Sequence, residues 1–426
     1  MTQDTKNMGT PIAGADKDRV LAINPGTTST KIGIFTRAGE EMSRSIHHGD
    51  DEIQQFKGRP MLDRLEYRAA KIEEALAEAG YSPSGGSVGE RRSAPTLSAE
   101  DAERMGHAAD SDFHPSRKNK DAARVGHPGP KIKTTELWAA VAGRGGMLPP
   151  IECGTYLVDD AMVEELQRAR RGEHASNLGA VLALRFARSA GVNAYIVDPV
   201  TVDEWQPRAR ITGSPLVERT FIGHALNTKA VAKRYARELG RAYAELRLIV
   251  AHMGSGITVS AHRNGRMIDS NSIEEGPFGP DRTGSLPVRA LIKLCMGGTM
   301  TEKELDRHVF GDGGLFAYLG TRDLKEVERR MEAGDGQARA VFEAMIYQIG
   351  KETGAMAAVL KGKVDAVLLT GGMAHSERVL TRLRGYIDWI APLAIYPGED
   401  ELRALAEGVF RVLDGEEEAK TVVSGQ

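Results

Sequence analysis

Residues 20–35 read VLAINPGTTSTKIGIF and residues 248–261 read LIVAHMGSGITVSA, and this recurring pattern decides the fold. In each stretch a short apolar strand leads into a small polar tip with glycine, and a second strand follows the tip. Gly26 and Gly254 mark the two tips, which lie about half the chain apart. A repeat at this spacing predicts two related domains, each with a β-hairpin near its start.

Strand and helix patterns alternate through the rest of the chain. We expect strands at Trp138–Ala142, Asn193–Val197 and Val364–Leu369, and helices at Arg64–Ala79, Thr228–Leu239 and Asp335–Leu360. Strands that alternate with helices and end in small polar loops are typical of α/β layers with sites at the strand ends. The predicted fold class is therefore α/β.

Composition excludes several classes of protein. The 426 residues favour two or three domains, and a net charge of −3 gives no bulk positive field for nucleic acid or anionic lipid. Two cysteines, Cys153 and Cys295, are too few for a disulfide framework, and we expect both to be buried thiols. Because no apolar run reaches membrane-spanning length and Met1–Asp18 lacks a signal core, we expect a cytoplasmic protein without membrane partners.

Two segments read as disordered, the N-terminal residues 1–18 and the stretch Ser82–Ile132. The second is rich in Ser, Pro and Gly and poor in large apolar residues, so it cannot bury enough surface to offset its ordering entropy. We interpret it as an insertion between a helix and a strand. The alternative is a regulatory or partner-binding arm that carries His107, His114 and His127.

The hairpin tips offer a route to phosphate binding. The chain has no G-x-x-x-x-G-K-[ST] loop, and the G-x-G at Gly254–Gly256 lacks the third glycine of the dinucleotide motif. Glycine lets the backbone approach a ligand closely, and N–H groups with Ser and Thr hydroxyls donate to phosphate oxygens. Ordinary polar loops remain the alternative for each tip.

Arginine, histidine and carboxylate residues in small-residue loops are the other candidates. Arg144 and Arg282 lie among glycines, which suits capture of a carboxylate or phosphate, with surface salt bridging as the alternative. His174 and His224 each precede an asparagine by three residues, a spacing that would place both side chains on one face of a helix. His252 begins the second tip. Oxygen ligands for Mg²⁺ are available at Asp198 and within Glu399-Asp400-Glu401, although the latter suits an acidic helix start equally well.

Long stretches of the chain resemble the acetate kinase family of carboxylate kinases, and within it the butyrate kinases. Besides both hairpins, the matching stretches include AVAGRGGMLPPI (140–151), GEHASNLGA (172–180), IGHALNTKAVA (222–232), EGPFGPDRTGSLP (275–287) and YPGEDEL (396–402). The resemblance covers nearly all of Arg19–Tyr81 and Lys133–Ala419. It implies the actin-like, or ribonuclease H-like, fold of the hexokinase-like ATPases: duplicated α/β domains with the active site in the cleft between them.

The resemblance also implies domain limits and partners. We expect a first domain at residues 19–206, completed by a C-terminal helix at about 398–420, and a nucleotide-binding domain at residues 207–397. Implied partners are ATP or ADP, Mg²⁺ and a small carboxylate. We expect no nucleic-acid partner, and a homodimer or higher homo-oligomer.

Roles carry over onto matching positions. The resemblance places Asn24 beside the transferring phosphoryl group and in the metal site, which it shares with Asp400 or Glu401. The catalytic group that it implies is Arg144, His174, Asp198, His224 and Arg282. The nucleotide-binding group that it implies is Asn24, Gly254, Ser255, Gly256, Asp323, Lys325, Gly371 and Gly372.

These elements suit one kind of chemistry. A carboxylate needs no general base at neutral pH, so catalysis must hold two anions together and stabilise charge during in-line transfer. The predicted reaction is reversible: ATP and butyrate give butyryl phosphate and ADP. The alternatives are a kinase for branched acids such as isobutyrate or isovalerate, an ATP-binding regulator of the same fold, and an inactive scaffold.

Overall fold

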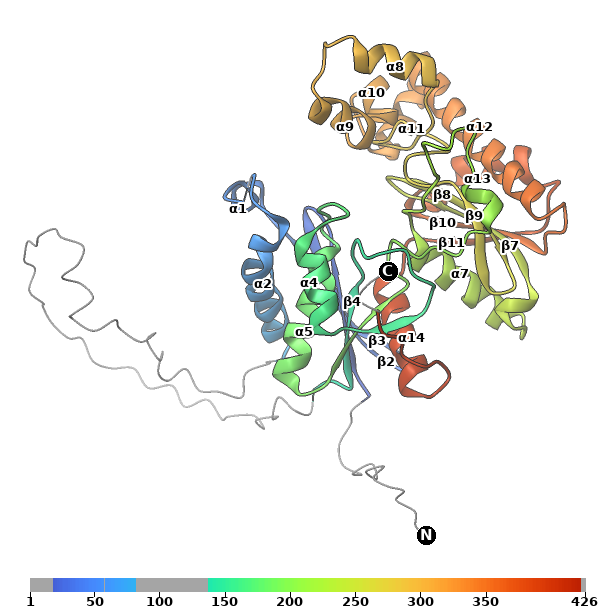
Figure 1. The fold of residues 1–426 in the computed structure, drawn as a ribbon. Helices are drawn as coiled ribbons and strands as arrows, with labels where there is room; N and C mark the ends of the chain where they lie inside the picture. The colour runs from blue at the N-terminus through green and yellow to red at the C-terminus, as the bar shows by residue number, and fades with distance from the viewer. Residues whose placement is uncertain (1–17, 57, 82–136, 423–426) are drawn as a thin grey trace, which may run out of the picture.

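Two mixed β-sheets, one in each half of the chain, form the framework of the protein in its computed structural model (Figure 1). The structure describes residues 18–56, 58–81 and 137–422. The disorder expected for residues 1–18 and for Ser82–Ile132 therefore falls outside the described residues, with Asp18 as the single exception.

The first sheet has the strand order β3-β2-β1-β4-β6-β5. β1 pairs antiparallel with β2 and parallel with β4, so the hairpin expected at 20–35 is confirmed. Every residue of β1 is buried, as its continuous apolar run predicts. The elements of this half are β1 (Val20–Pro25), β2 (Ser29–Thr36), β3 (Gly39–His47), α1 (Asp50–Gln54), η1 (Met61–Arg64), α2 (Leu65–Glu78), β4 (Ala140–Arg144), β5 (Thr155–Leu157), α4 (Asp160–Arg168), α5 (Asn177–Ala190), β6 (Asn193–Val197) and α6 (Pro207–Arg210).

The second sheet repeats this arrangement. From its β9 edge the order is β9-β8-β7-β10-β11, and β7 pairs antiparallel with β8 and parallel with β10. The same order and the same strand directions in both halves confirm the duplicated α/β fold. The elements are α7 (Ala225–Glu238), η3 (Tyr243–Glu245), β7 (Arg247–Met253), β8 (Ile257–Arg263), β9 (Arg266–Ser270), α8 (Val288–Met296), α9 (Glu302–Phe310), α10 (Gly314–Leu319), α11 (Leu324–Glu332), α12 (Gly336–Val359), β10 (Ala366–Gly371), η4 (Gly372–His375), α13 (Glu377–Ile387), β11 (Leu393–Pro397) and α14 (Glu401–Leu413).

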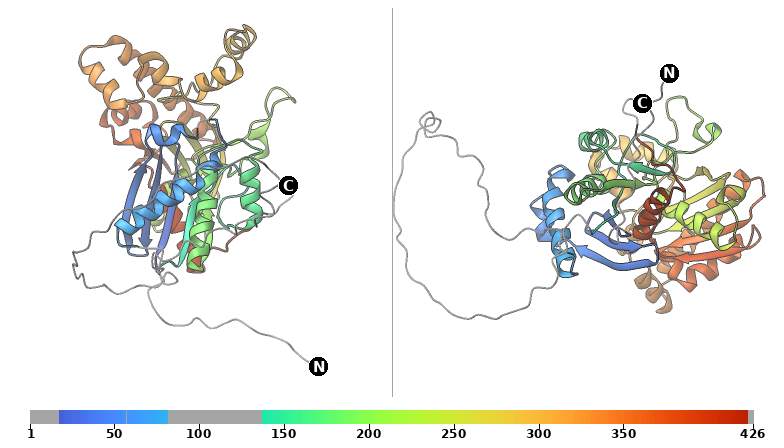
Figure 2. Two further views of the ribbon diagram at one scale, coloured as in Figure 1. Left: turned by 90° about the vertical axis from the view of Figure 1, so that its left-hand side faces the viewer. Right: turned by 90° about the horizontal axis from the view of Figure 1, so that it is seen from below.

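Helices cover both faces of the first sheet. α2 and α5 pack on one face around Leu21 and Ile23, whereas α14 covers the other face with Leu405 and Val409 against Val20. The last helix of the chain thus lies on the first sheet, as the view from below shows (Figure 2). The first residue of this helix, Glu401, therefore lies where the two halves meet.

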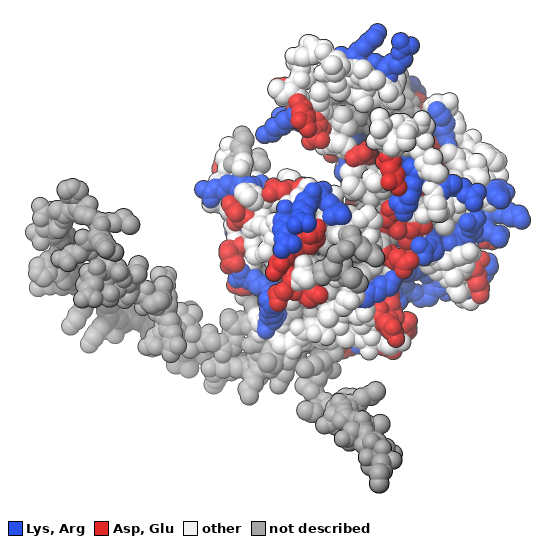
Figure 3. Space-filling model, viewed as in Figure 1, with Lys and Arg blue, Asp and Glu red and all other residues white. Residues whose placement is uncertain are grey.

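The space-filling surface is hollowed between the lobe that carries α8 to α11 and the lobe that carries α1 and α2 (Figure 3). The two hairpin tips follow the ends of the buried strands β1 and β7. Ligands of open α/β sheets bind at such strand ends. The two halves therefore face each other across a cleft.

Most predicted elements are confirmed to within a few residues, and two expectations need correction. α7 begins at Ala225 rather than Thr228, because Ala225, Leu226 and Asn227 are buried and continue the helix back to His224. The expected burial of the cysteines is wrong: Cys295 is exposed on α8, none of whose residues is buried, and Cys153 is only partly buried. Over the described ranges, no helix is long and apolar enough to cross a membrane.

Candidate functional site

A buried arginine braces the tip of the first hairpin. Arg68 of α2 is 1% exposed and donates to the backbone oxygens of Thr27 and Ser29 and to Oγ1 of Thr30. Burial, and after it the positive charge of Arg64, lowers the pKa of its guanidinium to about 10. Sequence reasoning missed Arg68, although its place on the apolar face of the predicted helix, four residues before Ile72, was a usable signal.

Asn24, Arg144 and Glu401 form a buried polar cluster at the end of the first sheet. Arg144 Nη1 lies 2.6 Å from Glu401 Oε2 and 3.4 Å from Asn24 Oδ1, and Asn24 Nδ2 donates to Glu401 Oε2 at 2.5 Å. The three side chains come from β4, α14 and β1, so only the folded sheet with α14 on it brings them together. Arg144 Nε is buried without a hydrogen-bond partner among the described residues, which leaves one donor of the guanidinium unused.

Of the two neighbouring carboxylates left open at the sequence level, the structure brings only Glu401 to this cluster. Asp400 precedes α14 in a left-handed conformation with φ 45°, and its exposed side chain lies 3.7 Å from Arg234. Glu399 faces Lys31 at 3.6 Å. Glu401 is 7% exposed and is the carboxylate that Asn24 and Arg144 share.

A histidine of the second hairpin stacks on a histidine at the start of α7. His224 caps α7, His252 lies in β7, and their rings stack with centroids 3.9 Å apart. Asn227 donates to the Glu399 backbone oxygen and accepts from His252 Nδ1, so the proton of the neutral His252 ring is on Nδ1. Its Nε2 is then a buried acceptor that no described residue satisfies. The sequence singled out His252 at the start of the second tip but gave it no role.

Glycine lets the second tip approach Arg282 closely. A Cβ on Gly256 would lie 2.5 Å from Arg282 Nη1 and 3.3 Å from His224 Cε1. His224 Nδ1 also contacts Thr258 Oγ1 at 2.9 Å. Ser255, at the outermost point of the tip, is exposed. The structure thus brings the Gly254–Gly256 tip, His224 and Arg282 together.

All three histidines of the cleft are neutral near pH 7. Burial lowers the pKa of His252 to about 4; the charge of Glu401 raises it, and the charges of Arg144 and Arg282 lower it. Burial, His252 and the two arginines hold the pKa of His224 well below its usual value. The surrounding protein and the same two arginines also lower the pKa of His174, although its ring keeps contact with solvent.

His174 presents a defined tautomer. Its Nδ1 accepts the backbone N–H of Ser176 at 3.2 Å and lies 2.7 Å from Ser176 Oγ. The proton of the neutral ring is therefore on Nε2, which is free to donate. Because Arg144 and Arg282 act on both His174 and His224, these four side chains converge on one region.

Asp198 follows Val197, the strand partner of Arg144, but its carboxylate has other partners. Its carboxylate accepts the Gly154 N–H at 2.8 Å and faces Lys233 Nζ at 3.6 Å, and it is 3% exposed. Neighbouring lysines outweigh burial and lower its pKa, so it stays ionised. The structure gives it no hydrogen bond or ion pair to Asn24, Arg144 or Glu401. Its backbone φ of 39° places it in a left-handed turn directly after β6.

The remaining candidate residues lie at the end of β10 and at the start of α11. Gly371 ends β10 with φ 88°, and a Cβ there would lie 2.5 Å from the Met253 oxygen, so β10 and the second hairpin meet closely. Gly372 begins η4. Asp323 caps α11 by accepting the Lys325 N–H, and α11 contacts the residue after η4 through Glu328 and Ser376.

Comparisons with known proteins identify the family of this chain. The sequence model of the acetokinase family matches residues 216–386 of this chain. Probable butyrate kinases of Clostridium botulinum, strains Alaska E43 / Type E3 and Eklund 17B / Type B, are each 41% identical over 404 residues, which cover 94% of this chain and 99% of the relative.

Solved structures of carboxylate kinases share the fold. Acetate kinase from Porphyromonas gingivalis superposes with a TM-score of 0.65 at 16% identity, covering 92% of this chain and 99% of that one. Acetate kinase from Entamoeba histolytica gives a TM-score of 0.64 at 13% identity, covering 93% of this chain and 100% of its own. At these identities the likeness concerns the fold alone.

Proposed function

This chain belongs to the acetokinase family, and we propose that it is a butyrate kinase, a phosphotransferase that moves the γ-phosphoryl group of ATP to the carboxylate of butyrate. The observation that carries the proposal is the convergence of Arg144 and Arg282 with neutral histidines and the Asn24–Glu401 pair. The names of the relatives that are 41% identical support butyrate as the acceptor.

The reaction needs no proton transfer. A carboxylate oxygen of butyrate forms a bond to the γ-phosphorus while the bond to the bridging oxygen of ADP breaks, which gives butyryl phosphate and ADP. Butyrate and ATP are both anions, so the chief barrier is their repulsion and the charge that spreads over the transferring group. Arg282 and the free donors of Arg144 supply positive charge and directed N–H groups where that charge develops.

Neutral histidines fit this task. His174 offers Nε2–H, and an uncharged ring donates a hydrogen bond to a phosphoryl oxygen without protonating the carboxylate nucleophile. Burial is the main cause that lowers the pKa of both rings, and the two arginines add to it by disfavouring a further positive charge nearby. We therefore assign the histidines to hydrogen bonding and positioning rather than to general acid–base catalysis.

The Asn24–Glu401 pair fits Mg²⁺. Mg²⁺ in phosphoryl-transfer sites takes one or two carboxylates and completes its shell with water and phosphate oxygens, so one buried carboxylate beside an amide oxygen is sufficient. Within the described ranges no group of three or more His, Cys, Asp and Glu is placed to hold a metal, which suits an ion that arrives with the nucleotide. When bound, Mg²⁺ would neutralise phosphate charge.

The second hairpin and the end of β10 are our proposed nucleotide site. The Gly254 N–H closes the tip by donating to the Gly256 oxygen, Ser255 is exposed at the tip, and Gly371 lies against Met253 beside it. Asp323 and Lys325 at the start of α11 complete the proposed wall. For Asp198 we propose a supporting role, because its contacts are to Gly154 and Lys233.

The test supplies ATP, Mg²⁺ and straight and branched acids of two to six carbons, with hydroxylamine to trap acyl phosphate as hydroxamate. We expect the highest kcat/KM with butyrate. A maximum with acetate or with a branched acid would overturn the assignment of butyrate. Intact ATP binding with no hydroxamate from any acid would overturn the kinase itself.

A further inference from the structure

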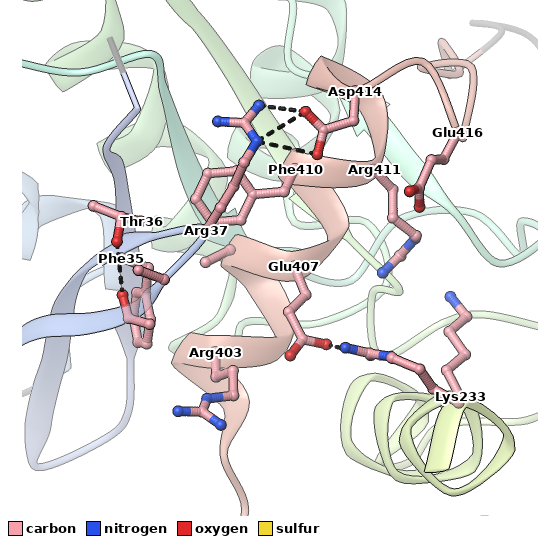
Figure 4. A pocket seen from close by; sticks show the side chains of 14 residues that line it. Phe35, Thr36, Arg37, Lys233, Arg403, Glu407, Phe410, Arg411, Asp414 and Glu416 are labelled. Carbon is pink, nitrogen blue, oxygen red and sulfur yellow. Dashed lines mark hydrogen bonds and ion pairs between the residues drawn. The ribbon is translucent and has the colours of Figure 1, made fainter. Parts of the chain in front are cut away.

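A row of cations on α7 pairs with carboxylates of the first half. The cations recur at four-residue spacing, which places them on one face of the helix. Their partners come from the segment after β6 and from α14, which packs on the first sheet: Lys229 pairs with Glu204 at 2.6 Å, Lys233 with Asp198 at 3.6 Å and Arg237 with Glu407 at 3.1 Å. Figure 4 shows part of this row, with Lys233 on α7 and Glu407 reaching toward α7 from α14. The row therefore fastens a helix of the second half to the first half.

The pairs at the two ends of this row differ in burial. The side chains of Arg237 and Glu407 are 64% and 34% exposed, and an ion pair of this kind holds a helix only weakly. The side chains of Lys229 and Glu204 are 0% and 2% exposed. Burial alone would raise the pKa of Glu204, but the charge of Lys229 outweighs it, so the pKa is lowered and the carboxylate stays ionised. The buried pair is thus the strong fastening.

Glu204 contacts both halves of the molecule. Its Oε1 accepts the N–H of Cys153, which precedes β5, at 3.4 Å, and its Oε2 accepts the N–H of Met267 in β9 at 2.9 Å. Lys229 Nζ also lies 3.3 Å from the Gly265 oxygen in the β8–β9 turn. Because a buried charge that loses its partner is strongly destabilising, α7 cannot turn or slide at Lys229 while this carboxylate stays in place.

The buried pair lies close to the active site along α7. His224 caps this helix five residues before Lys229, a distance of about 7.5 Å along the helix axis. Between them, Asn227 donates to the Glu399 oxygen and accepts from His252. The first turns of α7 are therefore held at two points, and the position of His224 depends on both.

We propose that Glu204 and Lys229 are positioning residues for phosphoryl transfer: as a buried ion pair they hold the start of α7, and with it the His224 ring, in place beside Arg282. This role rests on the proposed function, in which His224 acts on the transferring group. Neither residue touches the reacting atoms. Their effect is geometric, since a misplacement of about 1 Å at the reacting groups can lower the rate by about a hundredfold.

The double variant Glu204→Gln/Lys229→Met tests this role. It removes both charges at similar volume and leaves neither charge unpaired, so the fold should survive. We expect kcat for butyryl phosphate formation to fall by about tenfold, with KM for ATP and for butyrate within about twofold of wild type. In a His224→Ala background the same change should lower kcat by less than about twofold, because the residue through which the pair acts is absent.

The matched control is Asp203→Asn/Arg210→Gln. It removes the ion pair of the neighbouring residue, whose side chain is also 2% exposed but whose partner lies on α6 rather than α7. Its kcat should equal that of the wild type. Wild-type kcat in the folded Glu204/Lys229 double variant, an equal loss in the control, or the full tenfold loss in the His224→Ala background would overturn the role.

A second variant serves if the double variant does not fold. Glu204→Asp keeps both charges but shortens the carboxylate, which then cannot reach Met267 and Lys229 together, so kcat should fall by about threefold or more. Wild-type kcat in Glu204→Asp would overturn the role.

A measurement without turnover separates this role from the proposed function. The ring nitrogen-15 chemical shifts of His224 should move in the Glu204/Lys229 variants and stay fixed in the control. Unmoved shifts would overturn the positioning of His224 even in an active kinase. Shifts that move in a chain whose wild type forms no hydroxamate would support the positioning and overturn the proposed function.

Discussion

At the scale of single residues, the site depends on charges held in fixed pairs. Glu401 is buried, yet Arg144 and Asn24 satisfy it, so the cost of burying the carboxylate is offset by charge-assisted hydrogen bonds. Its neighbour Asp400 has the same chemistry but projects toward Arg234 instead. Of these two adjacent residues, only Glu401 therefore places its carboxylate in the site, whereas Asp400 places its carboxylate on the surface.

Glu401→Gln should raise the Mg²⁺ concentration for half-maximal activity by about tenfold or more, because the proposed metal site loses its only charged ligand from the protein. Asp400→Asn is the matched control and should leave this concentration nearly unchanged. Steady-state rates across a Mg²⁺ titration measure both. An effect of Asp400→Asn as large as that of Glu401→Gln would reverse the assignment.

At the scale of elements, the second hairpin positions Arg282 through close backbone contact. Gly256 leaves room for the guanidinium and for the His224 ring, so a methyl group there must displace one of them. A displacement of this kind costs the enzyme more activity than the fold loses in stability, since a misplacement of about 1 Å at the reacting groups can lower the rate by about a hundredfold.

Gly256→Ala should lower kcat by about a hundredfold with a smaller effect on the unfolding free energy. The control is Gly385→Ala on α13, where an added Cβ meets nothing within 4 Å and helix propensity favours alanine. Its kcat should equal that of the wild type, and its stability should be equal or slightly higher. Normal turnover by Gly256→Ala would show that the close approach of the second tip to Arg282 is not needed for catalysis.

At the scale of the whole molecule, buried neutral histidines link folding to pH. The pKa values of His48 and His252 are both lowered to about 4, in each case mainly by burial. In the unfolded chain they return to about 6.5. Between pH 6.5 and 4 the unfolded state therefore binds protons that the folded state does not, and stability must fall as pH falls.

Urea unfolding between pH 7 and 5 should show this loss, approaching about 1.4 kcal/mol per pH unit for each such histidine. His48→Gln should reduce proton uptake on unfolding at pH 5 by about one proton. Calorimetry in buffers of different ionisation enthalpy measures the uptake. Stability that is constant over this range would contradict the burial of these rings as neutral groups.

Much of this architecture could be predicted from the chain. Apolar runs before glycine tips identified both hairpins, and the spacing of Gly26 and Gly254 indicated the duplication that the strand order confirms. Arg144 and Arg282 were singled out because they lie among glycines, and His174 and His224 by their spacing to an asparagine, while their catalytic roles came from the family resemblance.

Long-range partners could not be predicted in the same way. The choice between Asp400 and Glu401 depends on a left-handed φ at Asp400, which local pattern does not encode. The orphan Nε2 of His252 depends on a contact with Asn227 across two elements. Cys295 was placed wrongly because α8 exposes a face that composition alone assigns to the core.

The central claim is that this site transfers phosphoryl groups to a carboxylate. Phosphorus NMR of the enzyme with ATP, Mg²⁺ and butyrate tests it most directly. We predict butyryl phosphate and ADP in equal amounts, with kcat reduced by about a hundredfold or more in Arg282→Ala while the fold is retained. Inorganic phosphate and ADP without butyryl phosphate, or normal turnover in Arg282→Ala, would contradict the account.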